Sequence, residues 1–279
     1  MKITSIDIQA INSPDAITLS FRDPKSINPY NIKSILGLDA ESIVPQYYGS
    51  PGGSTYYSLS LDKRVITMQV GLNPTFADGK SYSQLRDEFY KKIYSSRYGK
   101  LQLIFKEGSS EVATISGFIS KFEAPLFDQL PELKLTIECD EPMLKALEPV
   151  TIYSPTLDPS NTVLSDNKST APHGFSFEMQ ISSAGSLPSL TIIDPKDTWF
   201  FSIAPTGGFI NQDILHFSSD YSKELYIERY GIGIIYLADA VVTGSVWPLI
   251  FPGDNTFNFS HSEDLLWLSV SYLPTYWGV

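Results

Sequence analysis

Apolar and polar residues alternate with a period of two along most of the chain, and this pattern decides which kind of fold it can adopt. Ile66, Met68 and Val70, for example, are separated by Thr67 and Gln69. Successive side chains of an extended strand point to opposite faces of a sheet, so this alternation is typical of half-buried strands. The pattern recurs at 101–105, 133–139, 175–181, 257–259 and 266–272. The sequence therefore predicts a mainly β protein, with turn-forming Gly, Pro, Asn and Asp between the strands.

One segment has a helical period instead. Ser81 and Gln84 have the spacing of a capping box, in which each side chain binds the backbone NH of the other residue. Three apolar residues then follow at intervals of four, on one helical face: Leu85, Phe89 and Ile93. We therefore predict one α-helix, residues 82–96.

The charge of the chain is unevenly distributed over its 279 residues. Residues 1–148 carry 16 Lys/Arg and 18 Asp/Glu, a net charge of −2, whereas residues 149–279 carry 4 and 13, a net charge of −9. Such an acidic half is a poor surface for nucleic-acid phosphate and for anionic membranes. The change in charge predicts two domains, 1–148 and 149–279, and the Pro-, Ser-, Thr- and Asn-rich segment 149–173 is expected to be a linker and an irregular entry into the second.

Two motifs that resemble sites of chemistry have simpler interpretations. Gly79-Lys80-Ser81 precedes the helix like the end of a phosphate-binding loop, but Pro74 stands where that loop needs its first glycine. We therefore expect Ser81 to be a helix cap. Glu138, Asp140 and Glu141 could supply an acid/base pair, but adjacency in sequence does not give two carboxylates that face each other across a substrate. We expect them to be a solvated strand exit.

The metal-binding and nucleophilic side chains are also few. His173, His216 and His261 have no second His or Cys at ligand spacing, so structural or surface roles are expected. Cys139 is the single cysteine and lies in an alternating strand, where a buried thiol is the usual occupant. We predict no catalytic residue, no metal and no cofactor.

Aromatic side chains leave one alternative open. All four tryptophans lie in the second half of the chain: Trp199, Trp247, Trp267 and Trp277. Aromatic rings stack on sugars, although in β-sandwiches they usually belong to the core. A carbohydrate-binding module that contacts the host cell surface is therefore the alternative function.

Several segments together resemble the distal tail proteins (Dit) of long-tailed phages. In the first half these are Tyr47-Tyr48-Gly49 and the segments 64–71, 85–90, 99–105 and 133–139. In the second half, 247–259 is similar to the family's Pro-Gly-x-Asn-x-Phe turn, and the ending 272–279 also fits. The matched segments keep their order over most of the chain.

The resemblance implies an N-terminal β-sandwich or barrel-like domain with one helix, which forms a hexameric ring, and a C-terminal galectin-like β-sandwich. It implies a non-enzymatic virion protein, assembled in the host cytoplasm, that joins the tail tube protein to the tail-tip hub protein. Receptor-binding or side-fibre proteins are further expected partners. Charged residues on the helix are our candidates for subunit contacts: Arg86, Glu88, Lys91 and Lys92.

Overall fold

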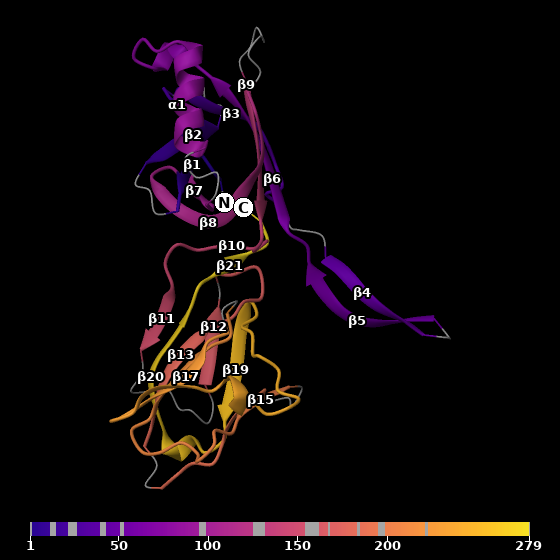
Figure 1. Ribbon diagram of the computed structural model, residues 1–279, viewed down its shortest axis with the longest axis vertical. Helices are drawn as coiled ribbons and strands as arrows, with labels where there is room; N and C mark the ends of the chain where they lie inside the picture. Colours follow the sequence, from indigo (N-terminus) through magenta and orange to yellow (C-terminus); the bar gives the residue numbers. More distant parts are fainter. Residues whose placement is uncertain are drawn as a thin grey trace. The chain divides into compact units, whose positions relative to one another are not determined.

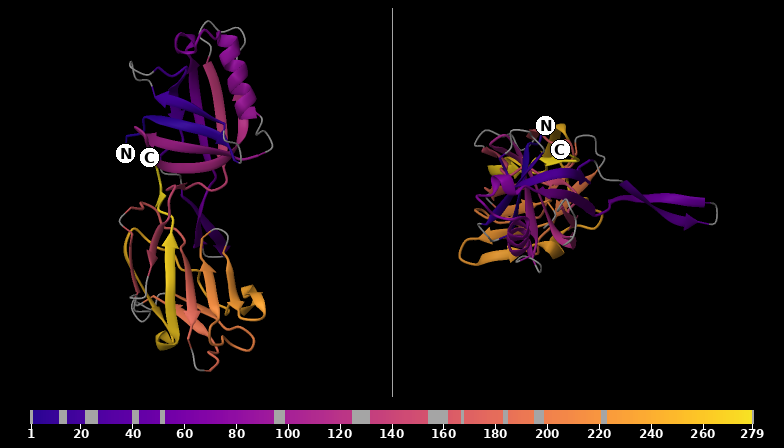
Figure 2. Two further views of the ribbon diagram at one scale, coloured as in Figure 1. Left: turned by 90° about the vertical axis from the view of Figure 1, so that its left-hand side faces the viewer. Right: turned by 90° about the horizontal axis from the view of Figure 1, so that it is seen from above.

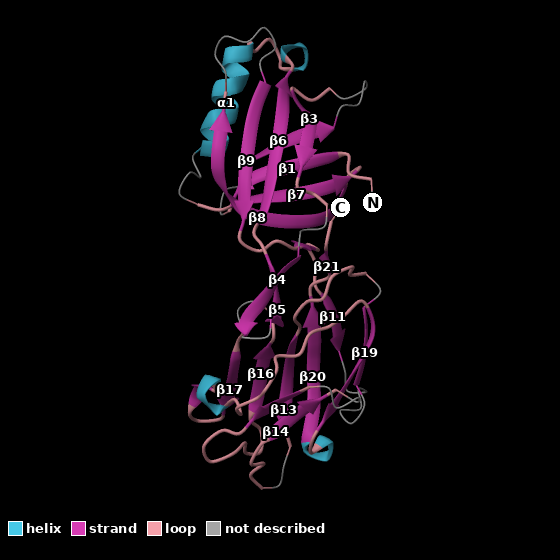
Figure 3. Cartoon of the chain, turned by 90° about the vertical axis from the view of Figure 1, so that its right-hand side faces the viewer, coloured by secondary structure: helices cyan, strands magenta, loops and turns pink. Residues whose placement is uncertain are grey.

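The computed structural model describes residues 2–11, 15–21, 27–39, 43–50, 53–94, 99–124, 132–153, 162–166, 168–182, 185–194, 199–220 and 223–278. The chain divides into two compact units (Figure 1). Unit 1 is Met1–Leu147 with Tyr276–Val279, and unit 2 is Glu148–Thr275. Strands dominate both units (Figure 3), which confirms the mainly β fold class.

Unit 1 contains a closed barrel. Its strands are β1 (Ser5–Ala10), β2 (Ala16–Phe21), β3 (Tyr30–Leu36), β6 (Arg64–Leu72), β7 (Leu101–Glu107), β8 (Ser110–Glu123) and β9 (Glu132–Cys139). They follow the order β8-β7-β1-β2-β3-β6-β9, and pairing of β8 with β9 closes the ring. Only the β2–β3 pair is parallel among these described strands. Closure gives each of these seven strands a neighbour on both sides, although β2 and β3 pair at only two positions, Ser20 with Asn31 and Phe21 with Ile32.

The predicted helix is confirmed as α1 (Tyr82–Tyr94), which packs against β1, β2 and β6 (Figure 2). The backbone NH of Ser81 donates to Gln84 Oε1 at 2.7 Å, and the NH of Gln84 donates to Ser81 Oγ at 3.3 Å, so the capping box is formed. The apolar face lies in the barrel core, where three side chains are at most 1% exposed: Leu85, Phe89 and Ile93. The last two residues of the predicted helix lie outside the described residues.

Arg64 is fully buried at the start of β6. Its guanidinium donates to three backbone carbonyls, those of Gly37, Pro142 and Trp277. The charge is therefore compensated by oxygen dipoles, as burial requires. Through Trp277 this network holds the end of the chain in unit 1, where β10 (Leu144–Lys145) and β21 (Thr275–Tyr276) extend the barrel sheet beyond β8.

A long hairpin, β4 (Ile43–Ser50) and β5 (Gly53–Leu61), forms a sheet of its own (Figure 1). Its register runs from Ile43 opposite Leu61 to Ser50 opposite Gly53, with one irregularity between Gln46 and Tyr47. Among the described strands, these two pair only with each other.

Unit 2 consists of two antiparallel sheets. One contains β11 (Val150–Tyr153), β20 (Leu265–Tyr272), β13 (Ser176–Ile181), β16 (Ile214–Ser218), β17 (Leu225–Arg229) and β18 (Gly233–Tyr236), in that order. The other contains β12 (Thr162–Asp166), β19 (Gly253–Phe259), β14 (Leu190–Ile193) and β15 (Phe200–Ile203). Short 3-10 turns are Pro74–Phe76 in unit 1 and Ala238–Ala240 and Ser262–Asp264 in unit 2. Apolar side chains of both sheets share one core, in which Phe177 stacks on Phe217 with ring centroids 4.7 Å apart.

The expectation that 149–173 is a linker was wrong for two of its parts. Residues 150–153 form β11 and residues 162–166 form β12, and each pairs with a strand from the last 30 residues of the chain. These long-range pairings outweigh the turn-like local composition, because strand propensity depends strongly on context. Residues 154–161 lie outside the described part of the chain. The expected domains, 1–148 and 149–279, differ from the two units at the end of the chain, since Tyr276–Val279 group with unit 1.

No helix among the residues that the structure describes is long and apolar enough to cross a membrane.

Candidate functional site

Helix α1 presents a charged surface opposite its buried face. Arg86 Nη2 lies 2.9 Å from Asp87 Oδ1, and Glu88 lies within ion-pair distance of both Lys80 (2.6 Å) and Lys92 (3.8 Å). Lys91 is exposed. The structure therefore places the four candidate contact residues on the outer side of one helix, where Arg86, Glu88 and Lys92 make local ion pairs. Exposed pairs of this kind contribute little to folding, typically 0–1 kcal/mol.

The three clustered carboxylates each have a different lysine partner. Glu138 pairs with Lys63, Asp140 with Lys100 at 2.7 Å, and Glu141 with Lys145 at 2.6 Å. Hydrogen bonding and charge attraction from Lys63 hold the pKa of Glu138 below its usual range, so that carboxylate is stabilised in its ionised form. The carboxylates do not converge on a common point, which agrees with the interpretation of a strand exit.

The histidines have carboxylate neighbours that the sequence spacing did not show. His173 Nε2 lies 2.8 Å from Asp166 Oδ2 and 3.1 Å from Ser169 Oγ, and all three residues are buried in unit 2. This set differs from a Ser-His-Asp triad, because Ser and Asp meet the same ring nitrogen and Nδ1 faces the carbonyl oxygen of Gly174 at 2.7 Å. Ser169 Oγ also accepts from the backbone NH of Thr275 at 3.0 Å, so the cluster fastens the end of unit 2.

His261 lies in an exposed turn with Glu263 and Asp264, and their ligand atoms are within 4.8 Å of one another. Exposed acidic groups of this kind are common on protein surfaces, so the turn alone is not evidence for an ion site. The lone cysteine is buried in β9, as predicted.

The tryptophans have diverse environments. Trp199 is partly buried against the core of unit 2, and Trp277 belongs to unit 1. The side chain of Trp267 lies outside the described residues. Trp247 packs on Phe201 and Phe217, with ring centroids 4.7 and 5.5 Å apart, and it also lines a hollow at the surface.

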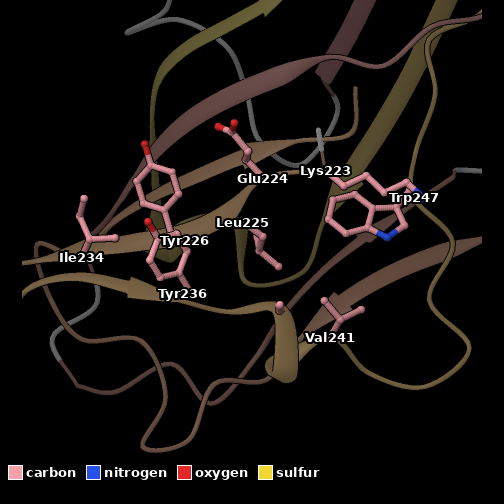
Figure 4. A pocket seen from close by; sticks show the side chains of 9 residues that line it. Lys223, Glu224, Leu225, Tyr226, Ile234, Tyr236, Val241 and Trp247 are labelled. Atoms are coloured by element: carbon pink, nitrogen blue, oxygen red, sulfur yellow. The ribbon is translucent and has the colours of Figure 1, made fainter. Parts of the chain in front are cut away.

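This first hollow has a volume of about 570 Å³ and lies beside β17 and β18 (Figure 4). The rings of Tyr226 and Tyr236 meet edge to face on one side, with centroids 6.1 Å apart. Lys223 and Trp247 stand on the other side, where the ammonium lies 5.7 Å from the ring centroid. Glu224 completes the polar lining. The hollow thus combines three aromatic rings with one cation and one carboxylate.

The ring of Tyr226 packs against the imidazole of His216. The two rings stack with centroids 4.5 Å apart and an interplanar angle of 14°. The imidazole itself lies between Glu178 (3.3 Å) and Glu228 (3.4 Å). Partial burial and the nearby carboxylates, Glu228 above all, raise the pKa of the Tyr226 phenol. At neutral pH its hydroxyl is therefore protonated and able to donate a hydrogen bond.

A second hollow of about 690 Å³ lies at the β17–β18 turn. Gln180, Gln212, Glu228, Arg229 and Tyr230 line it, together with Ile214 and the residues of the turn. Ile234 lines both hollows, so they are neighbours on the six-stranded sheet. We call the two together the β17–β18 groove. Of the residues that line it, only Trp247 was a candidate from the sequence.

The closed barrel with one helix and the two-sheet second unit form a fold that this chain shares with a phage distal tail protein. The crystal structure of the SPP1 Dit protein (gp 19.1) matches over 97% of this chain and 98% of its own, with a TM-score of 0.63 and 12% sequence identity. The SPP1 protein is a paradigm of the hub adsorption apparatus in phages that infect Gram-positive hosts.

Weaker matches include the phage P2 baseplate (TM-score 0.42, 9% identity, 98% of both chains) and the sheath/tube terminator of an extracellular contractile injection system (TM-score 0.30, 16% identity, 50% of this chain and 93% of the other). No protein-family model and no curated protein matches the sequence.

Proposed function

We propose that this chain is a distal tail protein of a phage, a non-enzymatic virion component that joins the tail tube to the tail-tip hub. The observation that carries the proposal is the fold shared with the SPP1 Dit protein over nearly the whole length of both chains. The sequence segments that resemble Dit proteins support the same function independently of the fold.

A ring of six subunits is the assembly that we propose for unit 1. The β4–β5 hairpin supports self-association, because its strands pair only with each other among the described strands. An isolated two-stranded hairpin is marginally stable in water, and its outer edges offer unpaired NH and C=O groups to a neighbour. Contact with an adjacent subunit would cover these edges.

The outer side of α1 is the second contact that we propose. Arg86, Glu88, Lys91 and Lys92 give this surface charges of both signs, which suits contact with a complementary surface on a neighbour. The proposed partners are the tail tube protein and the tail-tip hub protein, with receptor-binding or side-fibre proteins as further ones. The proposed location is the virion tail, assembled in the host cytoplasm.

The test is the oligomeric state of hairpin and helix variants, measured by native mass spectrometry with and without the tube and hub proteins. Replacing residues 45–59 by Asn-Gly keeps Val44 opposite Ser60 in a short hairpin. We expect this variant to keep the secondary structure and unfolding midpoint of unit 1 but to lose the hexamer. A wild-type chain that stays monomeric with both partners present would refute the ring.

A charge-reversed helix tests the second contact separately. Arg86→Glu with Lys92→Glu should weaken assembly while leaving the unfolding midpoint nearly unchanged. The matched control is Lys121→Glu with Lys134→Glu, which changes the same charge on the exposed faces of β8 and β9. If both double variants assemble equally well, α1 is not a subunit contact.

A further inference from the structure

We propose that the β17–β18 groove binds an uncharged oligosaccharide. This goes beyond the connector function, because it gives unit 2 a ligand of its own. A large exposed apolar surface on a folded domain is informative, since such surfaces commonly mark binding sites. The residues along this edge are highly exposed: Tyr230 is 91% exposed, Tyr236 78%, Ile232 71% and Ile234 56%.

The exposed rings of Tyr236 and Tyr230 supply the main stacking faces, since His216 stacks on Tyr226, and Trp247 contacts Phe217 and Lys223. Tyr226, Tyr236 and Trp247 line the first hollow, and Tyr230 lines the second. The apolar face of a pyranose ring packs on an aromatic face, and the ring hydroxyls then remain free for hydrogen bonds at their edges. Rings in both hollows allow more than one sugar unit to stack.

The lining is held in place before any ligand arrives. His216 stacks on Tyr226, and Trp247 packs on Phe201 and Phe217 of the core. Arg229 binds Asp213 at 2.7 and 3.0 Å and also donates to the carbonyl of Gly208. A preorganised site loses little conformational entropy on binding, which favours affinity for a flexible oligosaccharide.

The polar groups of the groove are better suited to bind the hydroxyl groups of a sugar than the surface of another protein. Glu224 and Glu228 accept hydrogen bonds, Lys223 donates them, and the amides of Gln180 and Gln212 do both. The buried centres of protein–protein interfaces are depleted in charged residues, whereas this groove has charged residues in both hollows.

The charge of the groove indicates an uncharged ligand. The half of the chain from residue 149 onward has a net charge of −9 and only four cations, of which two, Lys223 and Arg229, line the groove. Arg229 is already paired with Asp213, so Lys223 alone faces Glu224 and Glu228, and the lining keeps a small negative charge within an acidic domain. Anionic polymers are repelled by such a domain, whereas a neutral glycan is not.

The two hollows set the size of the ligand. Each volume, about 570 and 690 Å³, lies within the range of about 300–1,000 Å³ that is typical of small-molecule sites. Because the two hollows are neighbours at Ile234, a ligand that reaches both is an oligosaccharide and not a single sugar.

The experiment uses the full chain on a printed array of uncharged hexose and N-acetylhexosamine oligosaccharides, with anionic glycans as the comparison. Affinities for the strongest hit are then measured by isothermal titration calorimetry. We expect binding to uncharged members, and Tyr236→Ala should weaken it about tenfold, while Tyr236→Phe, which keeps the ring, should retain most of it. Phe251→Ala is the matched control, because Phe251 is 53% exposed in the same unit but lines neither hollow.

Three outcomes would overturn the proposal. The first is that no uncharged oligosaccharide binds. The second is that Tyr236→Ala and Phe251→Ala lose the same amount of glycan affinity. The third is that another tail protein, and not a glycan, covers Tyr236. None of these concerns unit 1, so ring assembly measured on the same variants distinguishes failure of the glycan site from failure of the connector function.

Discussion

Phe89 anchors α1 in the barrel core through its burial and its aromatic contacts. It is fully buried, its ring lies 5.5 Å from that of Tyr30, and it stacks on Phe122 at 6.0 Å. Replacing a buried Phe by Ala costs about 3–5 kcal/mol through lost burial and the cavity that remains. This range already includes the lost contacts with the two aromatic partners, and we expect Phe89→Ala to cost about 4 kcal/mol.

Such a loss is large compared with the stability of an ordinary domain, about 5–15 kcal/mol. With a urea dependence of about 2 kcal/mol/M, the unfolding midpoint of unit 1 should fall by about 2 M. Hydrogen exchange with mass spectrometry in urea assigns the change to a unit, and peptides of unit 2 should keep their midpoint. Tyr82→Ala, which removes a 48% exposed ring from the same helix, should change the midpoint by less than a quarter as much. Equal midpoints for Phe89→Ala and wild type would show that the helix does not stabilise the barrel.

Three further perturbations test the frameworks of the two units. Arg64→Met leaves three part-buried carbonyls without their donor, so unit 1 should lose about 3 kcal/mol, and hydrogen exchange at residues 276–278 should accelerate; slow exchange there would contradict the anchoring. Gly37→Ala should lower the thermal midpoint, because Gly37 has φ +85° and an added Cβ would lie 2.0 Å from the carbonyl oxygen of Val65, whereas Gly79→Ala, also at positive φ but in open space, should cost less. Burial alone would raise the pKa of Asp166, but hydrogen bonds from Ser169, His173 and two backbone NH groups lower it overall. The stabilisation by ionised Asp166 is therefore complete above the unfolded pKa near 3.8 and is lost as the pH falls through the lower folded pKa. Asp166→Asn should remove this part of the acid dependence of unit 2, and an unchanged acid profile would show that Asp166 does not contribute.

Local patterns predicted the elements whose stabilising contacts are local. The capping box and the spacing of Leu85, Phe89 and Ile93 lie within one 13-residue segment, so α1 could be read from the sequence. Strands β11 and β12 could not, because their partners are Tyr272 and Phe257 and their neighbours, about 100 residues away in the chain. Local composition reports the turn tendency of such a segment and contains nothing about the partner strand.

The β17–β18 groove shows the same limit for a site. Its lining comes from several elements between Gln180 and Trp247, and the sheet order, not sequence spacing, brings them together. One local signal was present, however. In β18 the outward positions are Ile234 and the aromatic Tyr236 and the inward position is Ile235, so neither face of this edge strand carries a charge. A solvated edge strand normally has polar residues or charges on its outer face. Apolar residues on both faces therefore indicate that β18 has a ligand or partner on its outer side, and the glycan array determines which.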